Sequence, residues 1–410
     1  MKVAILSDFH LGFGEGTERA EESFEQAASA LRLALDNNAE LILHTGDLFD
    51  EDIPSQETWD KTFKLFSILN EKKSDVLVVK EKKDEKKEFH FSHLPLIAIH
   101  GTHEYRGKEL KNALEVLESA GLLVHLHACT ATIGNLVVHG LGGVPEKKAL
   151  DALKMWGPKP VEGKKNVILL HQSIKEFLPF DDDMIATISL ADLPNGFDLV
   201  VNGHLHWTSE QNVAAGRFIM PGSTIITQMK RLEAEKGKGI FIWDTEADAL
   251  EFLSIPNQRK FFYKKLEFKE AERDKIKARV EKTLEEILAP TFPQKPLVKI
   301  KLVGSLAKGL QQGDISLKQQ TEKFKDKALI SVSRNFEAIS FAKKLEELRS
   351  LQKSRKSVTA MGLDLLEKNL SQTSFGNAFD PRDLFEMLAI GKIDKAVEKF
   401  LNNAPKREKV

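Results

Sequence analysis

Short apolar runs alternate with amphipathic stretches along the first 256 residues of the chain. A short apolar run between turn residues predicts a buried strand, whereas apolar residues that recur every three or four positions predict a helix packed on a sheet. The runs that predict strands are residues 3–6, 41–43, 96–99, 122–127, 135–140, 167–170, 199–201, 239–244 and 250–255. The stretches that predict helices are residues 21–37, 58–69 and 108–120. This order predicts an α/β fold for a first domain at 1–256.

A second pattern begins after Pro256. Apolar and polar positions alternate in three further runs, and a strongly charged helical pattern follows the first of them. The runs are residues 261–268, 297–303 and 328–333, and the helical pattern is 269–288. This order predicts a small α/β domain at 257–335. This domain either takes part in the function of the first domain or is a purely structural appendage.

The rest of the chain predicts helices joined by a linker. Residues 336–376 contain one helical pattern, at 337–352, and then a linker of small and polar residues. Residues 377–410 predict two short amphipathic helices, the first capped by Asp380 with Pro381 at its first position. Because such helices cannot bury their apolar faces alone, they dock either on the body of the protein or on a partner.

Five of the predicted strands are followed directly by polar residues of the metal-binding types. The carboxyl ends of strands in an open α/β sheet meet at one crevice, so five such ends can converge on one site. The alternative is that these are scattered polar loop residues. The five stretches are Asp8-Phe9-His10, Gly46-Asp47-Leu48-Phe49-Asp50, Gly101-Thr102-His103-Glu104, His171-Gln172 and Gly203-His204-Leu205-His206.

The residue types predict two metal ions. Carboxylates and neutral imidazoles suit manganese, iron or zinc, and a site of several thiolates is excluded because the chain has one cysteine. Two carboxylates and four histidines are too many ligands for one tetrahedral ion. They suit two ions that share a carboxylate, a geometry that holds a phosphate and activates water. Asp47 is the candidate for the shared carboxylate.

The ordered set of motifs resembles that of the calcineurin-like metallophosphoesterases, over about the first half of the chain. Within them, Gly46-Asp47-Leu48-Phe49-Asp50 and the long C-terminal extension resemble the SbcD/Mre nucleases of DNA double-strand-break repair. The resemblance implies a two-sheet α/β sandwich with a small α/β capping domain and a helical tail. It implies that one ion is held by Asp8, His10, Asp47 and His206, and the other by Asp47, His171 and His204. It makes His103 the histidine that protonates the leaving oxygen.

The sequence departs from the family pattern at two positions. Thr102 stands where the family usually has an asparagine whose amide oxygen binds the second ion, so a weaker hydroxyl ligand or a water is expected there. Asp50 stands where some relatives have a second catalytic histidine. Glu104 follows His103 directly and is a candidate to orient its imidazole.

Composition agrees with an intracellular enzyme. A length of 410 residues predicts two or three domains, and one cysteine excludes a disulfide framework. Residues 1–6 already read as a strand rather than as a leader, and no apolar run reaches the length of a membrane span. We therefore expect a cytoplasmic, nucleoid-associated protein. With 60 basic and 61 acidic residues, net charge gives no sign of nucleic-acid binding.

Three further groups of residues have two interpretations each. The lysines of residues 80–87 either contact phosphates or form a solvated face between acidic residues, and the interleaved acids favour the second. His125 and His127 alternate along a strand and either bind a metal or are structural, and the lack of a nearby carboxylate motif favours the structural interpretation. The same structural interpretation applies to four other histidines, His44, His93, His100 and His139. Lys230 and Arg231 either neutralise a phosphate or lie in solvent.

Together these features favour a manganese-dependent DNA exonuclease and endonuclease with two Mn²⁺ ions. The resemblance also implies a homodimer and a partner, an SbcC/Rad-type ABC ATPase bound by the C-terminal helices. One alternative is a phosphoesterase of the same superfamily that acts on small phosphodiesters, nucleotides or phosphoproteins. Another is a weakly active scaffold that binds DNA and the ATPase.

Overall fold

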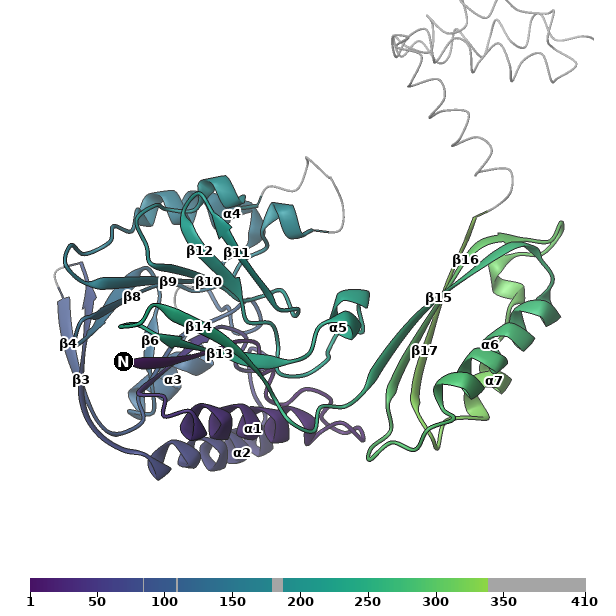
Figure 1. Cartoon of the computed structure of the whole chain (residues 1–410), viewed down its shortest axis with the longest axis horizontal. Helices are drawn as coiled ribbons and strands as arrows, with labels where there is room; N and C mark the ends of the chain where they lie inside the picture. The colour runs from purple at the N-terminus through teal and green to yellow at the C-terminus, as the bar shows by residue number, and fades with distance from the viewer. Residues whose placement is uncertain (84, 108–109, 179–186, 338–410) are drawn as a thin grey trace, which may run out of the picture. The chain divides into compact units, whose positions relative to one another are not determined.

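The computed structural model describes residues 1–83, 85–107, 110–178 and 187–337 (Figure 1). The chain divides into two compact units. The first comprises Met1–Lys264, Lys282–Ile300 and Gln320–Val332, and the second comprises Lys265–Glu281, Lys301–Gln319 and the described residues from Ser333 on. Within the described residues, no helix is both long enough and apolar enough to cross a membrane.

The first unit contains a six-stranded sheet. Its central strands run parallel, and an antiparallel hairpin of β13 and β14 extends one edge. In spatial order the strands are β14 (Ala249–Ser254), β13 (Gly239–Asp244), β1 (Lys2–Leu6), β2 (Leu41–Thr45), β5 (Leu96–Ile99) and β6 (Val124–Leu126).

The same unit contains an eight-stranded sheet. The strands β8, β9, β10 and β12 run parallel to their neighbours in this group, and antiparallel strands extend both edges. In spatial order the strands are β11 (Ser209–Val213), β12 (Gly216–Met220), β10 (Leu199–Asn202), β9 (Lys165–Leu170), β8 (Leu136–Leu141), β7 (Cys129–Ile133), β3 (Lys73–Lys82) and β4 (Glu85–His93).

The two sheets pack face to face with helices on both outer faces (Figure 1). Side chains alternate across a strand, so Val3 and Ile5 of β1 pack between the sheets while Ala4 and Leu6 pack against helices. The helices α1 (Glu22–Asp36), α2 (Gln56–Phe66) and α3 (Ala113–Ser119) cover the first sheet, and α4 (Glu146–Trp156) covers the second. The predicted two-sheet α/β sandwich is confirmed.

Two predicted helices differ from the observed ones at their ends. The helix predicted at 108–120 begins only at Ala113, because Asn112 caps it: its side chain accepts the Glu115 N–H at 2.9 Å and the Glu115 carboxylate accepts the Asn112 N–H at 3.0 Å. The helix predicted at 58–69 begins at Gln56 and ends at Phe66. A 3₁₀ turn, Ser67–Glu71, follows it.

The third sheet has three strands, in the order β15 (Phe261–Ala271), β16 (Leu297–Leu306) and β17 (Leu329–Glu337). The helix α6 (Arg273–Ile287) lies between the first two of these strands in the chain, as the sequence predicts, and α7 (Lys318–Glu322) lies between the last two. The prediction of a helix from residue 269 is wrong, since residues 269–271 still belong to β15. The tail helices predicted at 337–352 and in 377–410 lie outside the described residues, apart from Glu337, which ends β17.

Candidate metal centre

The five motifs of metal-binding residue types follow five strands of the two large sheets. The first three motifs follow β1, β2 and β5 of the first sheet, and the last two follow β9 and β10 of the second. Because these strands run parallel to their neighbours within each sheet, their carboxyl ends meet at one end of the sandwich. The side chains therefore converge from segments that are far apart in the sequence.

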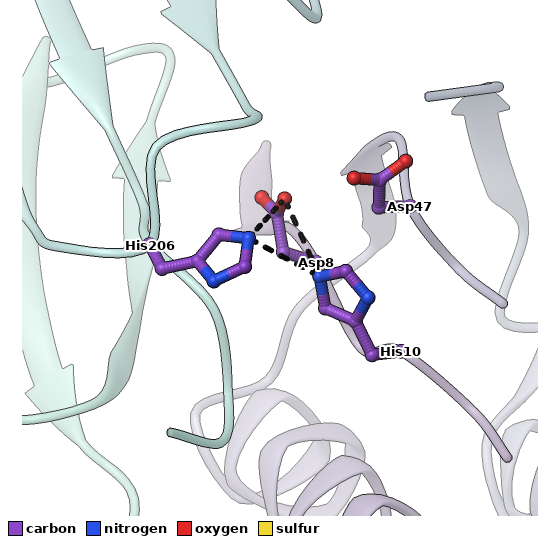
Figure 2. A group of neighbouring side chains, drawn as sticks. All are labelled: Asp8, His10, Asp47 and His206. Carbon is purple, nitrogen blue, oxygen red and sulfur yellow. Dashed lines mark hydrogen bonds and ion pairs between the residues drawn. The ribbon is translucent and has the colours of Figure 1, made fainter. Parts of the chain in front are cut away.

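Asp8, His10, Asp47 and His206 form one group, in which possible ligand atoms all lie within 4.8 Å of one another (Figure 2). The Nε2 atoms of His10 and His206 face each other at 3.2 Å. Oδ1 of Asp8 lies 3.6 Å from His206 Nε2 and 4.0 Å from His10 Nε2, and it is buried without a hydrogen-bond partner in the described part of the chain. Unpaired ligand atoms that converge in this way are what a cation needs.

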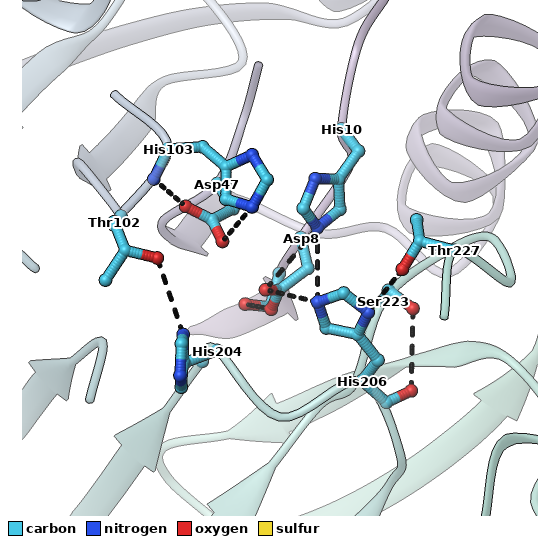
Figure 3. A network of polar contacts seen from close by, with 12 residues as sticks. Asp8, His10, Asp47, Thr102, His103, His204, His206, Ser223 and Thr227 are labelled. Atoms are coloured by element: carbon cyan, nitrogen blue, oxygen red, sulfur yellow. Dashed lines mark hydrogen bonds and ion pairs between the residues drawn. The ribbon is translucent and has the colours of Figure 1, made fainter. Parts of the chain in front are cut away.

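Asp47, His171 and His204 form a second group within the same 4.8 Å limit. Asp47 belongs to both groups, and its Oδ2 lies 3.1 Å from Nε2 of His171. Thr102 reaches the same group, where its hydroxyl lies 3.5 Å from His204 Nδ1 (Figure 3). A hydroxyl at this distance makes at best a weak hydrogen bond.

Oxygen atoms behind the imidazoles fix the direction of each ring. Nδ1 of His171 donates to the Thr45 carbonyl oxygen at 2.7 Å, and Nδ1 of His10 donates to Oδ1 of Asp50 at 3.0 Å. A hydrogen bond of 2.6 Å joins His206 Nδ1 to the Thr227 hydroxyl. Because Nδ1 of His10 and His171 is bonded to an oxygen behind the ring, Nε2 of each points into the centre, as metal-binding histidines require.

His103 lies at the rim of the centre. Its backbone N–H donates to Asp47 Oδ1 at 2.9 Å (Figure 3). Its Nδ1 donates to the Asp50 carbonyl oxygen at 2.6 Å. Nε2 lies 4.0 Å from Asp47 Oδ2, and 42% of the side chain is exposed. His103 is thus held beside the ligand groups with Nε2 free to exchange a proton with a bound molecule.

The charges of the centre demand a positive partner. Burial by itself lowers the pKa of His171, but the carboxylates of Asp47 and Asp8 raise that pKa to about 10. Burial by itself raises the pKa of Asp47, but His171 and His10 lower it well below its usual range. A proton shared by buried carboxylates and imidazoles occupies the place that a divalent cation can take, so the residues fit a metal.

The backbone at these motifs adopts conformations that most residues avoid. Asp8, His10, Asp47 and His204 have φ angles of 51°, 49°, 50° and 76°. Strain of this kind costs on the order of 1–3 kcal/mol per residue and persists where function requires it. A Cβ on Gly101 would overlap the side chain and backbone of Asp47. Only glycine therefore allows the third motif to approach the second so closely.

Glu104 holds the motifs together. The sequence suggests that it orients the His103 imidazole, but the structure gives it other partners. Its buried carboxylate accepts the backbone N–H groups of Gly101, Phe49 and Asp47 at 2.6, 2.7 and 3.2 Å. Burial and then the charge of Asp47 raise the pKa of Glu104 to about 7. Glu104 therefore fixes the loop after β5 to the loop after β2.

Two supporting residues were missed by the sequence interpretation. Lys238 is 3% exposed, and its Nζ donates to the His206 carbonyl oxygen at 2.6 Å, to Ser223 Oγ at 2.9 Å and to Glu233 Oε1 at 3.0 Å. On the other side, Oε1 of Glu146 lies 3.8 Å from His204 Nε2. Nothing in the local sequence distinguishes Lys238 from Lys236, two residues earlier, which is exposed.

We expect Lys238→Met to lower the free energy of unfolding by about 3–5 kcal/mol, because it leaves Glu233 as an unpaired buried charge. It should also weaken metal binding about tenfold to a hundredfold, because the carbonyl of His206 loses its donor. Urea denaturation and calorimetric metal titration measure the two effects. Lys236→Met is the matched control and should change neither; an unchanged Lys238→Met protein refutes the supporting role.

Three of the basic residues that were candidates to bind phosphate form ion pairs with acidic side chains. Arg231, in α5 (Arg231–Glu235), pairs with Glu235 at 2.9 Å, and both side chains are largely exposed. In the hairpin of β3 and β4, Lys80 pairs with Glu118 at 2.8 Å and Lys86 pairs with Glu81 at 2.6 Å. These ion pairs occupy charges that a bound phosphate would need.

The calcineurin-like phosphoesterase family model matches residues 1–208, which is half of the chain. The chain belongs to the calcineurin-like phosphoesterase family. The five motifs all lie within the matched residues, and the resemblance drawn from them is confirmed. A phosphoesterase with a cluster of possible metal ligands is therefore a metal-dependent hydrolase.

Curated relatives indicate which branch of this family the chain resembles. The DNA double-strand break repair protein Mre11 of Sulfolobus acidocaldarius is 23% identical over 75% of this chain and 76% of its own length. Mre11 of Sulfurisphaera tokodaii is 26% identical over 60% of each chain, and MRE11 of Mus musculus is 26% identical over 64% of this chain and 42% of its own. The matches thus cover from about two fifths to about three quarters of the length of these relatives. The predicted resemblance to the SbcD/Mre proteins is confirmed.

Solved structures are more distant. An archaeal phosphodiesterase is 17% identical, with a TM-score of 0.31 over 62% of this chain and 99% of its own. A dimetal phosphatase from Danio rerio is 9% identical, with a TM-score of 0.33 over 59% of this chain and 91% of its own. Scores this low support no functional assignment.

Proposed function

We propose that this chain is a manganese-dependent nuclease that hydrolyses phosphodiester bonds of DNA, with exonuclease and endonuclease activity. One observation carries the proposal: two groups of metal-binding side chains share Asp47, and His103 lies beside them. Shared carboxylates are typical of two-metal hydrolases that cleave phosphate esters. The names of the Mre11 relatives support DNA as the substrate and double-strand-break repair as the process.

We assign one ion to Asp8, His10, Asp47 and His206, and the other to Asp47, His171 and His204. Ions held by these residues would polarise a phosphate and lower the pKa of a bound water. Mixed carboxylate and imidazole ligands suit manganese. Thr102 offers the second ion only a neutral hydroxyl, which supports weaker binding there than an amide oxygen gives.

The chain's own residues position and protonate the substrate. His103 is oriented from behind by the Asp50 carbonyl oxygen and from the main chain by Asp47. Its Nε2 faces the centre and donates a proton to the departing oxygen, which avoids the release of an alkoxide. Asp50 serves twice, because its carboxylate orients His10 while its carbonyl oxygen orients His103.

Cleavage of linear duplex DNA in manganese tests the proposal. We expect release of nucleotides from DNA at a rate well above that for a panel of small phosphodiesters and nucleotides, with no cleavage when the metal is chelated. Cleavage of the small esters alone would identify a phosphoesterase with another substrate. DNA binding without cleavage of any substrate would identify a scaffold.

We further propose that the nuclease domain at 1–256 is followed by a DNA-binding cap at 257–335, a helix and linker at 336–376, and helices at 377–410 that bind an SbcC/Rad-type ABC ATPase. The two amphipathic patterns after Asp380 support this partner. Deletion of 380–410 should abolish co-purification with such an ATPase and spare manganese-dependent cleavage. Retained co-purification contradicts the assignment.

A homodimer formed through helices of the nuclease domain is part of the same proposal. Phe63 of α2 is 47% exposed and Val116 of α3 is 45% exposed. Both are apolar side chains on helices that cover the first sheet. Exposed apolar side chains on these helices support an interface between copies. We place the protein in the cytoplasm at the nucleoid, where its DNA substrate is found.

A further inference from the structure

Arg19 lies between two segments that carry ligands of the same ion group. His10 comes from the loop after β1 in the first sheet, whereas His206 comes from the loop after β10 in the second. Their Nε2 atoms face each other at 3.2 Å, so the distance between the two loops decides whether one ion reaches both rings. A residue that contacts both loops can therefore set the geometry of this ion site.

The guanidinium of Arg19 contacts the loop of His10 through Phe13. Its Cζ atom lies 4.8 Å from the centroid of the Phe13 ring, which is a cation–π distance. The Phe13 backbone N–H donates to the His10 carbonyl oxygen at 2.9 Å. Arg19 thus packs on the turn that fixes the main chain of His10.

The same guanidinium contacts the segment that supports the His206 ring. Nη2 of Arg19 donates to the Ile226 carbonyl oxygen at 2.6 Å. The next residue is Thr227, whose hydroxyl lies 2.6 Å from Nδ1 of His206 (Figure 3). One side chain therefore contacts the supports of both imidazoles.

Two buried charges hold Arg19 in this position. Glu22 accepts from Nε and Nη2 of Arg19 at 2.7 and 3.1 Å, the bidentate geometry that arginine forms with a carboxylate. Nε of Arg259 donates to the same carboxylate at 2.9 Å, and Nη1 of Arg259 donates to the Lys295 carbonyl oxygen. The three charged side chains are between 6% and 11% exposed. A movement of Arg19 would therefore separate a buried charge from its carboxylate, which is costly.

We propose that Arg19 is a positioning residue that sets the separation of His10 and His206 for the ion that they share. Glu22 and Arg259 act through Arg19 and keep its guanidinium in place. The role rests on the proposed two-metal function, because it concerns ligands of one of the two ions. A planar guanidinium bonds to a carboxylate and to a carbonyl oxygen at the same time, whereas an ammonium is a point charge on a flexible stem. Arginine rather than lysine is therefore required at this position.

A purely structural ion pair gives a different expectation. It would need only the positive charge of Arg19 beside Glu22, and its loss would affect the folded state as a whole. The ion group of Asp47, His171 and His204 has other supports, since the Thr45 carbonyl oxygen orients His171. The two roles therefore differ in which ion a variant binds more weakly.

Arg19→Lys tests the positioning role, because it keeps a positive charge beside Glu22 and removes the fork that also reaches Ile226. Calorimetric manganese titration of the full-length protein should show an affinity about 10–100-fold lower for one ion and unchanged for the other. The free energy of unfolding in urea should stay close to that of the wild type. Glu22→Gln should weaken the same ion and also destabilise the protein, because it leaves two buried guanidiniums without a carboxylate.

A ligand variant identifies the ion that is affected. His204→Gln removes a ligand of the other group, so the ion that remains is the one shared by His10 and His206. Adding Arg19→Lys to this variant should weaken the remaining ion by the same factor. An unchanged affinity in the double variant contradicts the positioning role.

Glu118→Gln is the matched control for Glu22→Gln. Glu118 is 14% exposed and pairs with Lys80 at 2.8 Å, and it belongs to neither ion group. This variant should lose stability and bind both ions as tightly as the wild type. Wild-type affinity for both ions in Arg19→Lys overturns the inference, and so does an equal loss for both, which a general loss of structure would give. A wild-type protein that binds no manganese would remove the proposed function, and this role with it.

Discussion

Replacement of His103 by alanine should lower the rate of phosphodiester cleavage by about 10²–10⁴-fold and leave metal binding unchanged. Nε2 of His103 is the part of this side chain that faces the centre, while Nδ1 is occupied by the Asp50 carbonyl oxygen. Without the imidazole, the leaving oxygen must take its proton from water. The ligand groups keep their side chains, so each ion should still bind.

Cleavage rates at saturating manganese and calorimetric manganese titration separate the two effects. His90→Ala is the matched control, because His90 is an exposed histidine of β4, and it should behave as the wild type does. Loss of an ion together with activity would show that His103 is a ligand. Full activity in His103→Ala would remove it from the mechanism.

The sequence predicted the positions of the motifs because each depends on a local pattern. A buried strand is recognisable as a short apolar run, and the polar residues directly after it must lie at the sheet edge. Asp8 after β1 and His171 after β9 needed no other information to be placed there. The two-sheet arrangement was implied by the resemblance to the metallophosphoesterases, whereas the runs themselves predicted only buried strands of an α/β fold.

The supporting contacts could not be predicted, because they join segments that are distant in the sequence. Lys238 contacts His206 across 32 residues, and the Thr45 carbonyl oxygen contacts His171 across 126. A carbonyl oxygen is present at every residue, so no sequence pattern marks the one that orients a ring. The partners of Glu104 are backbone amides as well, and for this reason its role was assigned to the neighbouring imidazole instead.

The neighbouring rings of His100, His125 and His127 are a second example of contacts that a local pattern does not show. The alternation of His125 and His127 was visible in the sequence, but His100 joins them only through the pairing of β5 with β6. A residue read in isolation as a buried histidine thus has two histidine neighbours in the fold. Parallel pairing over long connections is what local patterns do not encode.

Asp47→Asn should weaken binding of both ions at least about a hundredfold and abolish cleavage with them. Asp47 is the carboxylate that belongs to both ligand groups, and its charge holds the pKa of His171 at about 10 in the absence of metal. The amide keeps the size and an oxygen of the carboxylate but removes the negative charge. Calorimetric manganese titration should therefore show the loss of two ions rather than one.

Asp50→Asn is the matched control for Asp47→Asn, because it neutralises a carboxylate three residues away that contacts His10 and not both groups. It should weaken binding at the first group only, and by less, since an amide oxygen still accepts the His10 Nδ1 proton. If Asp47→Asn loses a single ion, the two groups do not share this carboxylate. The centre would then be two independent sites, and a bridging carboxylate could not be the reason that the second and third motifs approach so closely at Gly101.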